Sequence, residues 1–208
     1  LKWNFLDSGA LYRVLAIAAE RNQIKREDEL VQLIDQLDVK FNINDIESMA
    51  EVFFDGEVVT DVIRSETCGK AASVIAPIAA VRKALLTQQR AFCKEPGLIA
   101  DGRDMGTVVF PNAKLKIFLT ANIEERAKRR FKQLKQGGIS VNLRHLYTEI
   151  AERDKRDSTR NVSPLKPAED AIVIDTSTLD VKGVMEEILK LVVDRVPNLS
   201  RQVVDYLR

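Results

Sequence analysis

The chain has 208 residues, of which 45% are hydrophobic and 30% charged, and its formal net charge is +1. This composition is that of an ordinary globular protein, with one domain or a core that carries an inserted lobe. The near-neutral charge excludes a general attraction to nucleic acid or to anionic membranes. No apolar run approaches the roughly 20 residues that a membrane span needs. The two cysteines, Cys68 and Cys93, lack metal-ligand spacing, which favours a reduced, cytoplasmic protein in which both are packing residues.

Helices and a small sheet are predicted for the first third of the chain. Asp7-Ser8 supplies good N-cap residues, and apolar positions repeat at helical spacing in two segments, Ala10 to Arg21 and Glu27 to Leu37. Between residues 38 and 63 the apolar residues alternate instead, and Asp55-Gly56 is a strong hairpin signal. We therefore expect a small antiparallel sheet, inserted into a helix-rich chain.

A second helical segment is predicted from Ser65 to Lys94. Pro77 should divide it into two helices, because proline removes a backbone donor and clashes with the preceding turn. Ser73 then lies on the first helix and Arg82 on the second.

The stretch from Leu98 to Thr107 places a concentration of charge directly after an apolar run. Leu98 to Ala100 is short, apolar and bounded by turn residues, which is typical of a buried strand. Ligands of open α/β sheets lie at the carboxyl ends of such strands. The residues that follow this strand are Asp101, Gly102, Arg103 and Asp104. Opposite charges at this place suit an anionic ligand with a polar head, whereas the alternative is a turn with a solvated ion pair.

Two further buried strands are predicted at Leu115–Thr120 and Ala171–Asp175, with helices after Asn122, after Asn142 and from Val181 to Val193. Strands that alternate with helices indicate an α/β protein with a parallel sheet. Arg153, Asp157 and Arg160 fall on one face of the helix that follows Asn142. Taken alone, that face could equally be a solvated, salt-bridged surface.

Four separated motifs together resemble bacterial cytidylate kinases, which belong to the nucleoside monophosphate kinases. They are Leu6-Asp7-Ser8-Gly9-Ala10-Leu11-Tyr12-Arg13, Asp101-Gly102-Arg103-Asp104-Met105-Gly106-Thr107, the run from Glu152-Arg153-Asp154 to Arg160 with Ser163-Pro164-Leu165, and Ile174-Asp175-Thr176-Ser177. The resemblance covers all but about the last dozen residues. It implies a P-loop-type parallel-sheet core flanked by helices, a monophosphate-binding lobe with an antiparallel insert, and a helical lid. The implied ranges are 1–34, 96–142 and 170–208 for the core, 35–95 for the lobe and 143–169 for the lid.

The resemblance implies an enzyme that transfers the γ-phosphoryl group of ATP to CMP or dCMP with Mg²⁺ as cofactor. It further implies a cytoplasmic monomer that binds neither nucleic acid nor membrane. Arginines from separate segments suit this chemistry, because each guanidinium can hold phosphate oxygens in two bonds. Two alternatives stay open: a monophosphate kinase of another base specificity, and a non-catalytic nucleotide-binding protein without a P-loop.

The resemblance also implies roles for single residues. Those expected to bind CMP are Ser8, Tyr12, Arg13, Ser73, Arg82, Arg103, Asp104, Arg153 and Asp157. Among these, Arg13 and Arg103 hold the α-phosphate, Ser73, Arg82 and Asp104 face the cytosine, and Arg153 and Asp157 reach the sugar. Those expected to take part in the transfer are Asp101, which would hold a water on Mg²⁺, Arg103, Arg153 and Arg160. Arg160 and Arg156 serve the ATP side. A solvated basic helix face is the preferred interpretation of Arg126, Lys128, Arg129 and Arg130.

The glycine-rich phosphate-binding loop of the family, G-x-x-x-x-G-K-[ST], does not occur in this sequence. Gly69-Lys70 is no substitute, because Arg64 occupies the position of the first glycine. We expect the full-length protein to carry this loop and its lysine before Leu1, and the 208-residue chain alone to lack kinase activity. A coupled assay with ATP and CMP checks this, and ordinary turnover by the 208-residue chain would contradict it.

Overall fold

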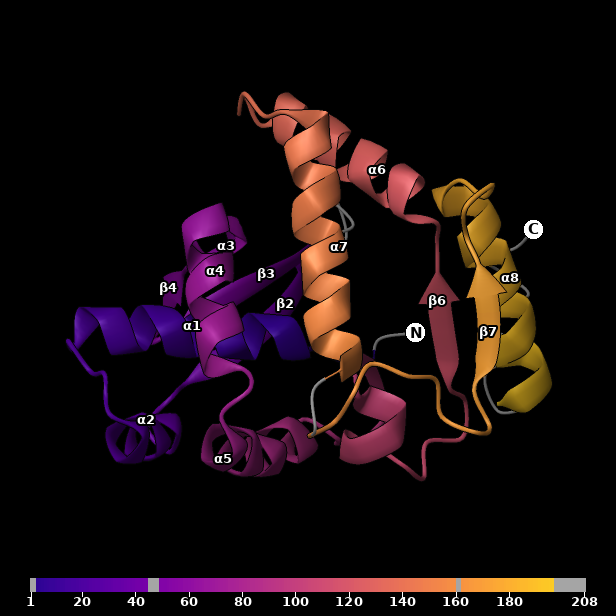
Figure 1. The fold of residues 1–208 in the computed structure, drawn as a ribbon. Coiled ribbons are helices and arrows are strands. Elements are labelled where there is room, and N and C mark those ends of the chain that lie inside the picture. Colours follow the sequence, from indigo (N-terminus) through magenta and orange to yellow (C-terminus); the bar gives the residue numbers. More distant parts are fainter. Residues whose placement is uncertain (1–2, 45–48, 160–161, 197–208) are drawn as a thin grey trace. The chain divides into compact units, whose positions relative to one another are not determined.

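Two parallel strand pairs and one antiparallel sheet organise the helices in the described part of this chain, and most of these elements are labelled in Figure 1. The computed structural model describes residues 3–44, 49–159 and 162–196. The chain divides into two units, Lys2–Met105 and a second that consists mainly of Gly106–Arg208. The α/β class is thereby confirmed: parallel strands are accompanied by helices in both units, and the antiparallel sheet lies in the first.

In the Lys2–Met105 unit, a parallel strand pair ends in two carboxylates. Strand β1 (Asn4–Asp7) pairs with β5 (Leu98–Asp101), and Asp7 lies opposite Asp101 in the register. The sequence predicted β5 but not β1, because the short apolar pair Phe5-Leu6 shows no period. The carboxyl ends of both strands therefore meet at one edge, where ligands of α/β proteins bind.

Helix α1 (Ser8–Arg21) is the central buried element of this unit. Asp7 caps it, as predicted, by accepting a hydrogen bond from the Ala10 amide at 3.0 Å. Ten of its 14 residues are buried, since apolar side chains continue around much of the helix. It packs against the antiparallel sheet, α3 (Thr60–Arg64) and α4 (Glu66–Ile75). The buried residues of this cluster are Ala10, Val14, Ile17, Ala18, Val52, Phe54, Val59, Ile63 and Cys68.

The antiparallel sheet has the order β2-β3-β4 and confirms the alternating pattern of the sequence. Its strands are β2 (Val39–Asn44), β3 (Met49–Phe54) and β4 (Glu57–Val58). Asp55 and Gly56 form the predicted hairpin turn with φ values of 50° and 81°, a pair of positive angles that fits the twist of the strands. The sheet ends earlier than residue 63, because α3 (Thr60–Arg64) already begins at Thr60. Residues 45–48 of the predicted range lie outside the described residues.

The remaining helices of this unit are α2 (Glu27–Ile34), α4 (Glu66–Ile75) and α5 (Ala79–Ala91). The break at Pro77 is confirmed, and it places Ser73 on α4 and Arg82 on α5.

In the Gly106–Arg208 unit, a second parallel pair joins β6 (Ile117–Thr120) to β7 (Ile172–Asp175). Its helices are α6 (Ile123–Gln136), α7 (Leu143–Thr159) and α8 (Val181–Arg195). The predicted helix starts hold: the Asn122 side chain accepts from the Glu125 amide at 2.8 Å, and that of Asn142 accepts from the Arg144 amide at 2.8 Å.

Four residues that the sequence analysis expected to be buried are exposed in the structure. Ile99, Leu119 and Val173, one in each predicted strand, are 46%, 50% and 55% exposed. A two-stranded sheet gives each strand a single neighbour, so side chains on an uncovered face stay exposed, unlike those of a sheet covered on both faces. Cys93 is exposed as well, whereas Cys68 is buried as expected.

The hairpin turn gives a stability test. Gly56→Ala is expected to destabilise the protein by about 1–2 kcal/mol, because a residue with a Cβ is strained in the left-handed backbone conformation of this position. The added Cβ itself would contact no neighbouring atom. Asp55→Gly is the matched control, and it should change stability less, since glycine adopts a positive φ freely. Urea unfolding followed by circular dichroism measures both. Equal values for the two variants would contradict the turn geometry.

Candidate functional site

A buried ion pair between α5 and the loop after β5 lies at the centre of the candidate site. Arg82 donates from Nη2 to Oδ2 of Asp104, and the two side chains are only 9% and 7% exposed. Arg82 also donates from Nη1 to the Ala76 carbonyl at 3.2 Å. Its guanidinium carbon lies 5.9 Å from the centre of the Tyr12 ring, within the range of a cation–π contact. Three of the residues that the sequence singled out, Tyr12, Arg82 and Asp104, therefore meet in one cluster.

The ion pair leaves one donor of Arg82 unused. Its Nε is buried and has no hydrogen-bond partner among the described residues. A buried donor without an acceptor costs free energy, so native structures keep such groups rarely and often at functional positions. Arg82 therefore retains a hydrogen-bond donor for a ligand even while it holds Asp104.

Ser8 lies at the start of α1 and is buried at 4% exposure. Its Oγ accepts a hydrogen bond of 2.8 Å from Nε2 of Gln89, which is itself 2% exposed. Gly102 packs directly on Ser8, because a Cβ added there would lie 2.9 Å from the Ser8 Cβ and 2.9 Å from Cε of Met105. Glycine is thus required at position 102 by a close approach of side chains. Sequence reasoning missed Gln89, although its place seven residues after Arg82 puts both on one helix face.

Two carboxylates, those of Asp7 and Asp101, lie side by side at the ends of β1 and β5. The Asp101 residue is exposed overall, but protein atoms surround its carboxyl group, and this loss of hydration raises its pKa. The nearby carboxylate of Asp7 raises the pKa of Asp101 further, while the Gly102 amide and the charge of Arg103 act in the opposite direction. A cation near these two groups would relieve the repulsion between them.

Arg13 and Ser73 both make contacts near α4. Nη1 of Arg13 donates to the Ile63 carbonyl at 2.5 Å, and its guanidinium would lie 3.3 Å from a Cβ placed on Gly69. Ser73 donates from Oγ to the Gly69 carbonyl at 2.8 Å, so its proton is used within its own helix. In this structure Ser73 consequently offers lone pairs rather than a donor. Arg103 is half-buried.

The predicted residues of the Gly106–Arg208 unit lie on α7. Arg153 and Asp157 share a face as expected, with Nε and Oδ2 at 3.8 Å, and Arg156 lies 3.9 Å from Glu152. Arg160 lies outside the described residues. The structure therefore places Arg153, Arg156 and Asp157 along one helix. Each of the two arginines lies near a carboxylate one turn away, Arg153 near Asp157 and Arg156 near Glu152.

The basic face of α6 is only partly solvated, which corrects the expectation for two of its arginines. Arg126 binds Asp154 of α7 with both nitrogens, at 2.5 and 2.9 Å, and this hydrogen bonding raises the pKa of Arg126. Arg129 donates to Oγ1 of Thr176 at 3.1 Å and to the Leu179 carbonyl at 3.2 Å. These bonds fasten α6 to α7 and to the turn after β7, through partners that no local pattern reveals.

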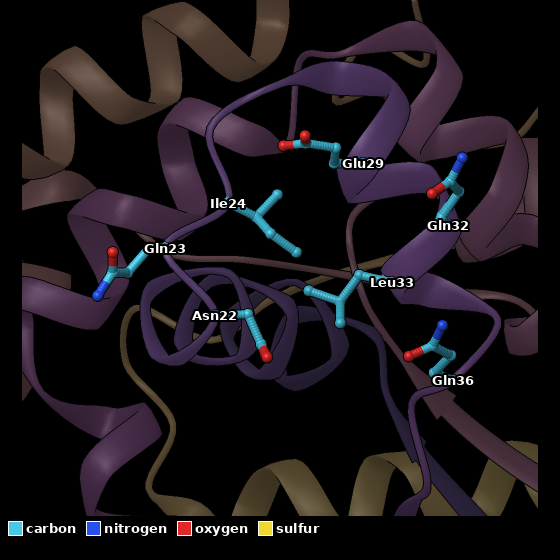
Figure 2. Close-up of a pocket in the computed structure, with 7 residues that line it drawn as sticks. All are labelled: Asn22, Gln23, Ile24, Glu29, Gln32, Leu33 and Gln36. Carbon is cyan, nitrogen blue, oxygen red and sulfur yellow. The ribbon is translucent and has the colours of Figure 1, made fainter.

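A surface pocket elsewhere in the Lys2–Met105 unit takes no part in this cluster. Figure 2 shows its lining, which comes from the end of α1, the turn after it, and α2: Asn22, Gln23, Ile24, Glu29, Gln32, Leu33 and Gln36. None of the predicted site residues is among them. Glu29 is the only titratable group in the lining, so the pocket lacks the charged groups of a reaction site.

Comparison with known proteins covers nearly the whole chain. Residues 1–194 match the family model described as cytidylate kinase. A cytidylate kinase of Nitrosococcus oceani is 57% identical over 192 residues, which are 91% of this chain and 84% of that protein. The cytidylate kinase of Stutzerimonas stutzeri is 54% identical over 94% of this chain and 86% of its own length. The cytidylate kinase of Colwellia psychrerythraea is 53% identical over 91% of this chain and 84% of its own length. The similarity thus spans both units.

Asp101→Asn is expected to raise the melting temperature at pH 7. The pKa of Asp101 is raised in the folded protein, so its ionised form opposes folding above that pKa. The penalty disappears as the pH falls through the raised pKa and below the ordinary value of about 3.9. The stabilisation should therefore shrink on acidification.

Asp170→Asn is the control of opposite sign. Hydrogen bonds from Lys116 lower the pKa of Asp170, so this variant should be less stable at pH 7, and the difference should fade as the pH falls through that lowered pKa. Calorimetry from pH 7 down to about pH 2 measures both variants, so that it covers the lowered pKa of Asp170 and the ordinary pKa of an aspartate. A lower melting temperature for Asp101→Asn at pH 7 would contradict the repulsion between Asp7 and Asp101.

Proposed function

The chain belongs to the cytidylate kinase family, and we propose on that basis that it transfers the γ-phosphoryl group of ATP to CMP, giving ADP and CDP. The observation in the structure that best supports this activity is the buried pair of Arg82 and Asp104 beside Tyr12. Burying two charges costs several kcal/mol per ion, and hydrophobic residues in their place often give equal or greater stability. A role in recognising a polar ligand accounts for their presence better than stability does.

The edge of cytosine matches the groups of this cluster. Cytosine presents an amino donor at N4 beside acceptors at N3 and O2, whereas uracil has an acceptor at position 4 and a donor at N3. We assign Asp104 as the acceptor for the amino group and the unused Nε of Arg82 as a donor to the ring. Ser73, whose proton is held by Gly69, adds a second acceptor. Uracil would place acceptor against acceptor and leave buried polar groups unpaired, which discriminates strongly.

Phosphoryl transfer between two nucleotides brings several negative charges together, so positioning and neutralisation dominate catalysis. In this proposal, Arg13 and Arg103 hold the acceptor α-phosphate, and Ser8 and Tyr12 line the pocket. Arg153 and Asp157 bind the sugar, while Arg156 and Arg160 serve ATP. Segment 35–95 is the monophosphate-binding lobe and 143–169 the lid. The triphosphate of ATP additionally needs the backbone amides and the lysine that a glycine-rich loop supplies.

Mg²⁺ is the proposed cofactor. The few carboxylates available to bind it agree with an ion that arrives together with the nucleotide. In the part of the chain that the structure describes, no group of three or more His, Cys, Asp or Glu side chains forms a metal cage. Mg²⁺ usually keeps several waters and takes one or two carboxylates together with substrate phosphates. Asp101 and Asp7 would hold its water shell, and the ion would neutralise charge on the phosphates. The repulsion that raises the pKa of Asp101 favours a cation there.

The proposal extends to dCMP as a second acceptor and to a cytoplasmic monomer. Cys68 and Cys93 are both free thiols, which agrees with a reducing compartment. Within the described ranges, no helix is both long and apolar enough to cross a bilayer.

Asp104→Asn tests the assignment of the base. The variant keeps the size of the side chain but presents an amide, so kcat/KM for CMP should fall steeply and that for UMP much less. The ratio of the two should narrow by roughly tenfold to a hundredfold. Steady-state kinetics of the enzyme with each nucleotide measures this ratio.

Asp38→Asn is the control for the loss of one charge, since Asp38 forms an exposed pair with Lys40. Its ratio should stay at the wild-type value. Thermal unfolding must accompany the kinetics, because removal of one partner from a buried ion pair destabilises a protein. A folded Asp104→Asn enzyme with an unchanged CMP-to-UMP ratio would show that the base is recognised elsewhere.

A further inference from the structure

We infer that Gln89 is a positioning residue, which fixes the Ser8 hydroxyl as a hydrogen-bond donor toward the bound pyrimidine. The inference rests on the proposed function, in which Ser8 lines the CMP pocket. It concerns a residue outside the four sequence motifs, and it follows from the direction of one buried hydrogen bond.

The bond runs from the amide of Gln89 to the oxygen of Ser8. Nε2 of Gln89 donates to Ser8 Oγ over 2.8 Å, and both residues are more than nine-tenths buried. A serine hydroxyl carries one proton and rotates to suit its partners. Because the oxygen already accepts from Gln89, the proton must point away from that amide. Within residues 3–44, 49–159 and 162–196, this proton meets no acceptor.

The Ser8 side chain is also fixed in position. The backbone of Gly102 approaches so closely that an added Cβ would lie 2.9 Å from the Ser8 Cβ. Gln89 lies on α5 with Arg82, seven residues or about two turns apart, so one helix carries both the base-facing guanidinium and the amide that orients Ser8. Gly102 therefore fixes where the hydroxyl lies, and Gln89 fixes which way its proton points.

A donor at this place suits cytosine. Both N3 and O2 of cytosine accept hydrogen bonds, whereas N3 of uracil carries a proton. The bond from Gln89 to Ser8 joins two neutral groups, so it adds direction without a further buried charge. Together with Nε of Arg82, Ser8 would supply donors to the ring, while Asp104 supplies the acceptor.

The test measures CMP binding to the 208-residue chain by isothermal titration calorimetry, with the variants Ser8→Ala, Gln89→Met and Gln89→Glu. Gln89→Met removes the donor at nearly constant volume. Gln89→Glu offers an acceptor instead, so that Ser8 turns its proton toward the new carboxyl group. Gln88→Met is the matched control, because Gln88 is the adjacent residue of α5 and donates to the Ile34 carbonyl, a different partner. Circular dichroism establishes that each variant is folded.

Gln89→Met is expected to raise the Kd for CMP roughly threefold to tenfold, the worth of one neutral hydrogen bond. Gln89→Glu should raise it more, by about tenfold to a hundredfold, since the pocket then loses its donor. Gln88→Met should leave the Kd unchanged. In the Ser8→Ala background, Gln89→Met should raise the Kd for CMP by less than about twofold further, because the effects of substitutions at contacting residues do not add.

Three results would overturn the inference: wild-type affinity in Gln89→Glu, wild-type affinity in Ser8→Ala, or an undiminished effect of Gln89→Met in the Ser8→Ala background. A merely structural glutamine would give the last of these. If the wild-type chain binds no CMP, the proposed function fails and this inference with it. If wild type binds CMP and Asp104→Asn weakens binding, while both Gln89 variants behave like Gln88→Met, only the role of Gln89 is refuted.

Discussion

The buried ion pair of Arg82 and Asp104 is the interaction on which the candidate site depends. It joins the first turn of α5 to the loop after β5, with both side chains almost completely removed from water. Neither charge can stay buried without the other, so the two segments are fixed relative to each other within their unit. The Ala76 carbonyl and the Tyr12 ring surround the guanidinium. The pair still leaves the buried Nε of Arg82 as a hydrogen-bond donor for a ligand.

Around this pair the unit separates groups of different electrostatic character. Asp7 and Asp101 gather negative charge at the ends of β1 and β5, where repulsion favours a proton or a cation. Ser8 on α1 and Gln89 on α5 form a buried hydrogen bond between two neutral groups. One short motif, from residue 101 to 104, thus holds both a member of this carboxylate pair and Asp104, which in the proposed function serve Mg²⁺ and the base respectively. A substitution in it is expected to affect more than one step of the reaction.

The arginines of α7 are far more exposed to solvent than Arg82. Arg153 and Arg156 pair with carboxylates one turn away at 3.8 and 3.9 Å, and about half or more of each arginine side chain is exposed. Exposed pairs of this kind contribute about 0–1 kcal/mol. Arg156 can therefore exchange its partner Glu152 for a phosphate oxygen at little cost. Arg126, by contrast, binds Asp154 with two nitrogens and fastens α6 to α7.

The sequence by itself determined the features that depend on neighbouring residues: the cap at Asp7, the turn at Asp55-Gly56, the break at Pro77 and the family motifs. Only the tertiary structure decided which distant groups meet. The partners in the Arg82–Asp104 pair are 22 residues apart, and those in the Ser8–Gln89 bond are 81 apart. Periodicity and capping report on a few consecutive residues, whereas a hydrogen bond between elements depends on the whole path of the chain. Strand β1 escaped prediction for the same reason, because its partner β5 lies more than ninety positions away.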